Sequence, residues 1–197
     1  MVALACLAAA FAGYRLAGRP DNPQAALSPG TWLPHARRIE PFRLTDSQGR
    51  PFTQADLQGH LSLVYFGFTH CADECPDTLA LLSRVVRAAR LPQLQVLFVT
   101  IDPKRDTPAV LAAYLRRFDP DFIGLTGDAA RIDALARSLG VATGAIGIPG
   151  GGETFEHTVA LFLFDAQARE AAVFMPPFHA RRVAEVLRRV ARRLAST

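Results

Sequence analysis

The segment Thr69–Pro76 contains the residues best suited to chemistry. Its two cysteines, Cys71 and Cys75, are separated by three residues and follow the apolar run Leu61–Phe68. Pro76 suits the first position of a helix, so we expect Cys75 at or near the N-cap. The backbone N–H groups and the positive end of the helix dipole would then favour its thiolate. A thiolate in such a place acts as a nucleophile or as a metal ligand.

The C-x-x-x-C spacing favours metal binding without excluding a disulfide. Residues four apart on a helix have Cβ atoms about 5–6 Å apart, whereas a disulfide requires roughly 3.5–4.5 Å. A metal ion bridges the longer gap, because each metal–sulfur bond is about 2.3 Å long. Cys71 can also lie in the loop before the helix, so both chemistries stay open at this point.

A metal held by two thiolates needs a further ligand, and the histidines are the candidates. The sequence has five of them: His35, His60, His70, His157 and His179. His157 follows a loop (145–156) and comes just before the apolar run Val159–Phe164. A loop at the edge of a central strand can bring His157 to the cysteines. A single histidine at a strand edge is also typical of an ordinary surface residue, so the residues alone leave the third ligand open.

The elements that must position these residues alternate between strands and helices. Continuous apolar runs predict buried strands, and apolar residues at helical spacing predict amphipathic helices. We expect a hairpin over 42–53, strands at 61–68, 95–101, 122–125 and 159–164, and helices at 79–89, 108–118, 129–139 and 181–194. This alternation indicates an α/β fold with a largely parallel sheet covered on both faces.

The chain of 197 residues divides into three parts. Residues 1–17 contain the apolar run Val2–Tyr14, which is shorter than a full membrane span and matches a signal or membrane anchor. Ala3–Cys6 resembles a lipoprotein cleavage box, but we interpret Cys6 as one small residue of the anchor. Residues 18–38 are rich in proline and predict a linker, and residues 39–197 form one globular domain.

Four segments in this order and spacing are similar to the Sco/SenC family, over about residues 40–195. They are Leu63–Leu79, Val99–Pro108, Phe122–Gly127 and His157–Asp165. These family members are thioredoxin-fold copper proteins that help to assemble the copper centre of respiratory cytochrome oxidase. By position, the resemblance implies copper ligands at Cys71, Cys75 and His157, and Asp73 also matches. The chain departs from the family at Ala72, where proline is usual, and in the Gly-rich loop before His157.

The resemblance implies a thioredoxin-like fold and a copper metallochaperone that delivers copper to a subunit of cytochrome c oxidase. Soft thiolates select Cu(I), and imidazole accepts either oxidation state of copper. Two cysteines and one histidine are too few for a closed zinc site. We expect a monomer anchored in the inner membrane, with its domain facing the periplasm, which binds and delivers copper without enzymatic turnover.

The main alternative is an enzyme, a thiol–disulfide oxidoreductase that keeps a partner's cysteines reduced. It would use Cys71 and Cys75 but not His157. A peroxiredoxin-like peroxidase is a third reading, which the C-x-x-x-C-P pattern supports poorly. A nucleic-acid partner is not expected, because the net charge is only +4 and 21 of the 22 basic residues are arginine, a bias typical of genome composition.

Other features have plainer explanations. The segment 144–152 is rich in glycine but lacks the Gly-Lys-Ser/Thr ending of a phosphate-binding loop, so we expect a flexible loop. The plainest explanation of Asp102 and Asp106 is a turn at a strand end and a helix cap. The resemblance places this loop near the cysteines and so implies a supporting role for Asp102. The arginines of the last helix predict a basic face exposed to solvent, and Met175 predicts loop packing.

Overall fold

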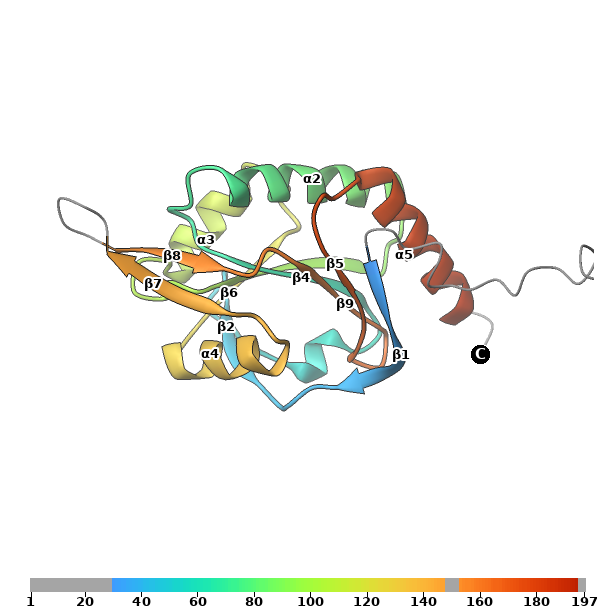
Figure 1. Cartoon of the computed structure of the whole chain (residues 1–197), viewed down its shortest axis with the longest axis horizontal. Helices are drawn as coiled ribbons and strands as arrows, with labels where there is room; N and C mark the ends of the chain where they lie inside the picture. The colour runs from blue at the N-terminus through green and yellow to red at the C-terminus, as the bar shows by residue number, and fades with distance from the viewer. Residues whose placement is uncertain (1–29, 148–152, 195–197) are drawn as a thin grey trace, which may run out of the picture.

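The computed structural model describes residues 30–147 and 153–194. The expected anchor (1–17) and the first part of the expected linker lie outside the described residues. The centre of the fold is an eight-stranded sheet in the order β1-β10-β9-β4-β5-β6-β2-β3 (Figure 1). In chain order its strands are β1 (Gly30–Arg38), β2 (Arg43–Asp46), β3 (Pro51–Thr53), β4 (Leu61–Gly67), β5 (Leu94–Thr100), β6 (Ile123–Thr126), β9 (Leu161–Phe164) and β10 (Arg169–Phe174). A separate two-stranded ribbon pairs β7 (Thr143–Gly147) with β8 (Glu153–His157).

Helices cover both faces of the large sheet, as the alternating pattern predicts. Figure 1 shows α2 (Glu74–Ala89), α3 (Pro108–Leu115) and α5 (Ala180–Leu194) on one face, and α4 (Ala129–Ser138) on the other. The short 3₁₀ helix η1 (Gln54–Leu57) contributes to the core on the α4 side. Within residues 30–147 and 153–194, no helix combines the length and the apolar character that a membrane crossing requires.

Burial explains why the central elements form where they do. Every residue of β4 is buried, because helices pack against both faces of this strand. On α2, Leu79 and Leu82 are fully buried while Arg84 and Arg87 are exposed. This amphipathic face packs α2 onto the sheet beside α5. The expected hairpin over 42–53 is confirmed by the antiparallel pair β2 and β3.

The fold is thioredoxin-like, but the prediction of a mostly parallel sheet is wrong. Only the β4–β5 and β5–β6 pairs are parallel, and the other pairings of the large sheet are antiparallel. The helical crossovers that parallel pairing requires connect β4, β5 and β6 alone. On the two sides of this parallel centre, β9 and β2 run in the opposite direction, and β10, β1 and β3 extend the sheet outside them by further antiparallel pairing.

The sheet also includes a segment that the sequence assigns to the linker. Residues 30–38 form β1, which pairs with β10, so the domain begins before the predicted boundary at residue 39. The register shifts between Trp32 and Arg37, and this irregularity interrupts the alternation that would mark a strand. At the end of β1, Arg37 forms an ion pair with the buried Glu170 of β10 at 2.5 Å.

The β2–β3 hairpin is closed by a buried carboxylate. Asp46 is 3% exposed, and its Oδ1 accepts hydrogen bonds from the backbone N–H groups of Gln48 and Arg50. Its Oδ2 accepts from the Arg50 guanidinium at 2.8 Å. Burial alone would raise the pKa of Asp46, but the hydrogen bonds and charge of Arg50 and the Gln48 N–H outweigh it and lower the pKa.

We therefore predict that Asp46→Asn lowers the free energy of unfolding by about 1–3 kcal/mol at pH 7. A carboxylate with a lowered folded-state pKa stabilises the fold above its unfolded pKa, and this stability is lost as the pH falls through the folded value. The difference between Asp46→Asn and the wild type should thus shrink toward pH 3 in denaturant titrations. Asp133→Asn, at an exposed position of α4, is the control, and an equal loss in both variants would contradict the prediction.

Candidate metal centre

The turn between β4 and α2 places the two cysteines side by side. The Cys71 N–H donates to the Phe68 carbonyl at 3.3 Å, which turns the chain after β4. Helix α2 begins at Glu74, so Cys75 is its second residue, close to the expected N-cap. The N-cap residue, Asp73, makes no side-chain cap, and the Cys75 N–H donates to Cys71 Sγ at 3.4 Å. Both thiols are free.

The Cys75 sulfur lies in a tight, fully buried position. The Tyr65 hydroxyl donates to it across 3.6 Å from within β4. Gly67 leaves the space that the sulfur occupies, because a Cβ on Gly67 would lie 2.8 Å from Cys75 Sγ and 2.8 Å from a ring carbon of Phe98. The position of this sulfur is therefore fixed by β4 and β5 as well as by its own helix.

His157 reaches the same sulfur from the end of β8. Its Nε2 lies 3.9 Å from Cys75 Sγ, although the two residues are 82 positions apart in the chain. Its Nδ1 lies 3.2 Å from the Thr158 carbonyl, which can only accept, so Nδ1 carries the proton and Nε2 offers its lone pair toward the sulfur. The rings of Tyr65 and Phe68 pack edge-on against the imidazole.

The ribbon that carries His157 is anchored at its base. The Thr158 N–H donates to the Ala142 carbonyl at 3.0 Å, and the Ala142 N–H donates to Thr158 Oγ1 at 3.1 Å. The ring of Phe155 packs against Phe68 with centroids 5.5 Å apart. Figure 1 shows β7 and β8 projecting away from the large sheet. Residues 144–147, expected to be loop, are thus the second arm of the ribbon, whereas 148–152 lie outside the described residues.

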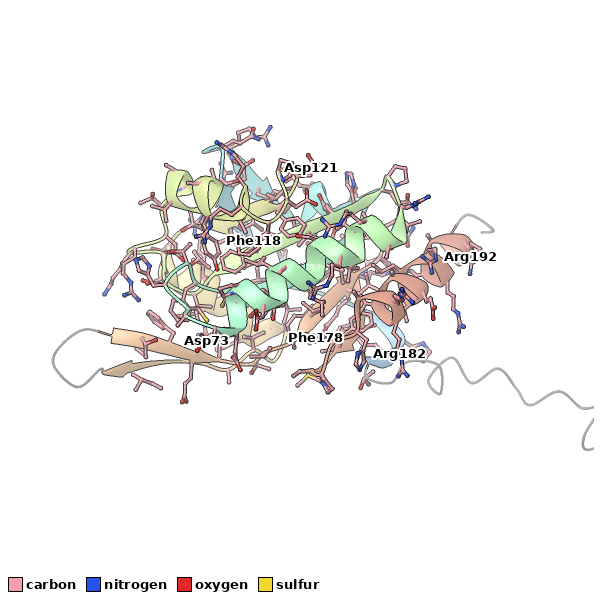
Figure 2. The ribbon with its side chains drawn as sticks, turned by 90° about the horizontal axis from the view of Figure 1, so that it is seen from above. Asp73, Phe118, Asp121, Phe178, Arg182 and Arg192 are labelled. Carbon is pink, nitrogen blue, oxygen red and sulfur yellow. The ribbon has the colours of Figure 1, made fainter. Side chains whose placement is uncertain are left out.

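The three predicted ligands lie at the same end of the large sheet, but their ligand atoms do not converge on one point. In the described part of the chain, the ligand atoms of Cys71, Cys75 and His157 do not all lie within 4.8 Å of one another. Cys71, His157 and Glu74 line an open cavity of about 570 Å³ between α2 and the ribbon. Figure 2 shows Asp73 at the start of α2, above this ribbon. An ion held by all three ligands would draw Cys71 inward from the cavity wall.

Burial has the largest effect on the pKa values of Cys75 and His157, the two expected ligands that lie in contact. Burial raises the pKa of Cys75 to about 12, despite the opposing hydrogen bonds from the Phe68 N–H and the Tyr65 hydroxyl. The expectation that the helix terminus favours a Cys75 thiolate is therefore wrong for the free protein. Burial lowers the pKa of His157, although the Thr158 carbonyl and the charge of Glu74 oppose this. His157 is thus neutral near pH 7, the form that binds metals.

A buried carboxylate ties the cysteine loop to the next loop of the sheet. Asp106 is fully buried and accepts hydrogen bonds from the Thr69 N–H at 3.0 Å, the Thr69 hydroxyl at 2.5 Å and the Thr100 hydroxyl at 2.6 Å. The side chain that caps α3 is Thr107, whose Oγ1 accepts from the Val110 N–H. Asp106 therefore positions the loop before Cys71, a role that sequence reasoning had considered only for Asp102.

His70 belongs to this carboxylate network and not to the cysteine pair. Ligand atoms of His70, Asp102 and Asp106 lie within 4.8 Å of one another. However, the Asp106 oxygens already accept from hydroxyl and amide donors, and Asp102 is paired with Arg105. We interpret this cluster as a structural network that fixes the loops on which the cysteines depend.

The donor set at the end of β4 fits copper better than zinc. Two sulfurs and one imidazole nitrogen form a soft, three-donor set, which suits Cu(I). A closed structural zinc site has four protein ligands. The cavity beside Cys71 leaves one side of the site open to solvent.

Comparisons with known proteins agree with this architecture. Residues 33–192 match the SCO1/SenC family. The SCO2-like protein of Rickettsia prowazekii is 34% identical over 152 residues, which cover 75% of this chain and 74% of that protein. The bovine mitochondrial SCO2 homologue is 48% identical over 104 residues, 51% of this chain but only 39% of its own length. The copper-bound structure of Bradyrhizobium japonicum ScoI superposes with a TM-score of 0.72 and 35% identity, over 78% of this chain and 99% of that one.

The chain therefore belongs to the SCO1/SenC family. The family match includes the whole cysteine segment, the carboxylate loop and His157. It also includes most of β1, in agreement with the early start of the domain.

The close approach at Gly67 leads to a prediction for the site. Gly67→Ala places a methyl group where Cys75 Sγ and Phe98 now meet, so we expect a loss of about 1–3 kcal/mol in the free energy of unfolding. Displacement of the sulfur should also weaken copper binding, measured by competition with a chelator. Gly147→Ala is the matched control, because a Cβ at Gly147 enters open space. Equal stability and affinity in both variants would show that the sulfur is not held at this contact.

Proposed function

We propose that this protein is a copper metallochaperone that delivers copper to the copper centre of a respiratory cytochrome c oxidase. The observation that carries the proposal is the 3.9 Å approach of His157 Nε2 to Cys75 Sγ, with Cys71 beside Cys75. Membership of the SCO1/SenC family supports it, as does the similarity to Bradyrhizobium japonicum ScoI, which has been solved with copper bound.

The proposed binding step exchanges a proton for a metal ion. In the free protein Cys75 keeps its proton, because the buried sulfur is costly to ionise. A copper ion replaces that proton and offsets the negative charge, with His157 Nε2 already directed at the sulfur. Cys71 is only partly buried and faces the open cavity, so an acceptor's own ligands can reach the ion from that side.

We also propose where and with what the protein acts. Residues 2–14 would anchor it in the inner membrane of a bacterium with the domain facing the periplasm, and the acceptor would be a copper-binding subunit of the oxidase. The protein would act as a monomer that binds and delivers copper, without enzymatic turnover and without a nucleic-acid partner.

A thiol–disulfide oxidoreductase is the second candidate. The different exposure of the two cysteines supports this function. Cys71 is the more exposed thiol and accepts the Cys75 N–H, while Cys75 is buried behind it. In this reaction the Cys71 thiolate would attack a partner disulfide to form a mixed disulfide. Cys75 would then displace the partner, which leaves a Cys71–Cys75 disulfide and two thiols on the partner.

The two candidates differ in their need for His157. We predict that His157→Ala weakens Cu(I) binding by about 100-fold or more, because loss of a ligand should exceed the effect of losing a supporting contact. The measurement is anaerobic competition with a Cu(I) chelator. Exchange between the protein's dithiol and a small disulfide should be largely unchanged in the same variant.

The matched control is His60→Ala, because His60 is exposed and precedes β4 at the end opposite the cysteines. Copper affinity of this control should equal that of the wild type. Wild-type affinity in His157→Ala would remove His157 from the site and leave the oxidoreductase as the better account.

A cellular prediction tests both candidates together. The double variant Cys71→Ser, Cys75→Ser should fail to restore oxidase activity in a strain that lacks this protein, because it retains neither the soft donors nor the dithiol. His157→Ala should also fail if copper delivery is the function, but should restore activity if only thiol exchange is needed. Full rescue by the double cysteine variant would refute both.

A further inference from the structure

The ribbon that carries His157 shares no strand pairing with the large sheet in the part of the chain that the structure describes. Its two strands pair with each other, and the hydrogen bonds between Ala142 and Thr158 join the two arms of the same ribbon. Backbone pairing therefore fixes the ribbon internally. Apart from the chain connections at its two ends, its position against the cysteine loop depends on side-chain contacts.

Arg105 makes one of these contacts from the loop between β5 and α3. Its guanidinium carbon lies 5.9 Å from the centroid of the Phe155 ring on β8, within the range of a cation–π interaction. The same guanidinium pairs with the carboxylate of Asp102, which is 3% exposed. Because this partner is buried, it holds the positive charge over the ring even though part of the Arg105 side chain is exposed to solvent.

A row of rings continues this contact from Phe155 to the imidazole. Phe155 packs against Phe68 with ring centroids 5.5 Å apart, and Phe68 packs edge-on against His157 at 6.5 Å. Phe68 is buried and directly follows β4. Arg105 and Phe68 therefore both contact Phe155, and two residues further along β8 the ribbon places His157 beside Cys75.

The loop that carries Arg105 also holds the cysteine loop. Asp106, the next residue, accepts hydrogen bonds from the Thr69 N–H and the Thr69 hydroxyl. The loop itself is closed by hydrogen bonds from the N–H groups of Arg105 and Asp106 to the Asp102 carbonyl. Two adjacent residues of one loop thus contact the two parts of the site, because Asp106 binds the cysteine loop and Arg105 contacts the ribbon.

We propose that Arg105 is a positioning residue, which holds the ribbon against the cysteine loop and so keeps His157 beside the Cys75 sulfur. The proposal rests on the proposed function and adds to its site a residue that acts through Phe155. Release of copper requires the imidazole to leave the ion, and the ribbon moves with it. Loss of the Arg105 contact therefore lets His157 leave more often, while the set of donor atoms stays the same.

The test compares Arg105→Gln with Arg169→Gln in the full-length protein. Arg169 is the matched control, because it pairs with the buried Asp165 near the opposite end of β4 and is 41% exposed, against 38% for Arg105. Release of Cu(I) to an excess of chelator, followed anaerobically by stopped flow, should be about two- to fivefold faster in Arg105→Gln, the range that a partly exposed cation–π contact allows. Arg169→Gln should release copper at the wild-type rate.

Two further backgrounds separate this role from a general loss of stability. Phe155→Leu removes the ring and keeps the pair of Arg105 with Asp102, so it should also release copper faster, and adding Arg105→Gln to it should have no further effect. Adding Arg105→Gln to His157→Ala should leave the release rate of that variant unchanged. A wild-type release rate in Arg105→Gln, or an effect that persists in full in either background, would overturn the proposal.

The free protein supplies a readout that does not need copper. Nuclear Overhauser contacts between the rings of His157 and Tyr65, whose centroids lie 6.0 Å apart, should weaken in Arg105→Gln but not in Arg169→Gln. If the wild type does not bind Cu(I), the proposed function is refuted, yet weaker contacts would still assign the position of the ribbon to Arg105. If the wild type binds Cu(I) and His157→Ala weakens that binding, but Arg105→Gln matches Arg169→Gln in both measurements, only the role of Arg105 is refuted.

Discussion

The whole site depends on one buried sulfur atom. Cys75 Sγ lies over Gly67, accepts a hydrogen bond from the Tyr65 hydroxyl and faces His157 Nε2 across 3.9 Å. Because it is removed from water, its thiol resists ionisation, with a pKa raised to about 12. In the proposed function, a soft cation would take the place of the proton and so remove this penalty.

The fold brings this contact about by combining two kinds of strand pairing. The parallel centre places the ends of β4 and β5 at one edge of the sheet, so that the cysteine loop and the carboxylate loop meet there. Asp106 fastens these two loops together. The antiparallel ribbon β7–β8 then delivers His157 to the same edge, and two hydrogen bonds between Ala142 and Thr158 fix its base. Strand pairing thus brings the cysteines and His157, which are far apart in the sequence, to the same edge of the sheet.

Sequence reasoning was most successful where local chemistry dominates. The apolar β4 and the Cys-Pro pair predicted a buried strand followed by a helix start, and both are present. It failed where tertiary context decides. Because the register of β1 is irregular, its sequence lacks the alternating pattern that would predict a strand. No feature of the neighbouring sequence indicates the burial that raises the pKa of Cys75. In the sequence Tyr65 looks like an ordinary core residue, because only the folded structure brings its phenol to the Cys75 sulfur. His157 gained its role from family resemblance, since spacing alone left it open.

The most direct test of the central claim is X-ray absorption at the copper edge of the metal-loaded protein. The account predicts a single copper ion per chain with two sulfur ligands and one imidazole nitrogen, which correspond to Cys71, Cys75 and His157. Such a result would show that Cys71 moves inward to complete the set. A copper ion bound by sulfur alone, or shared between two chains, would contradict the account.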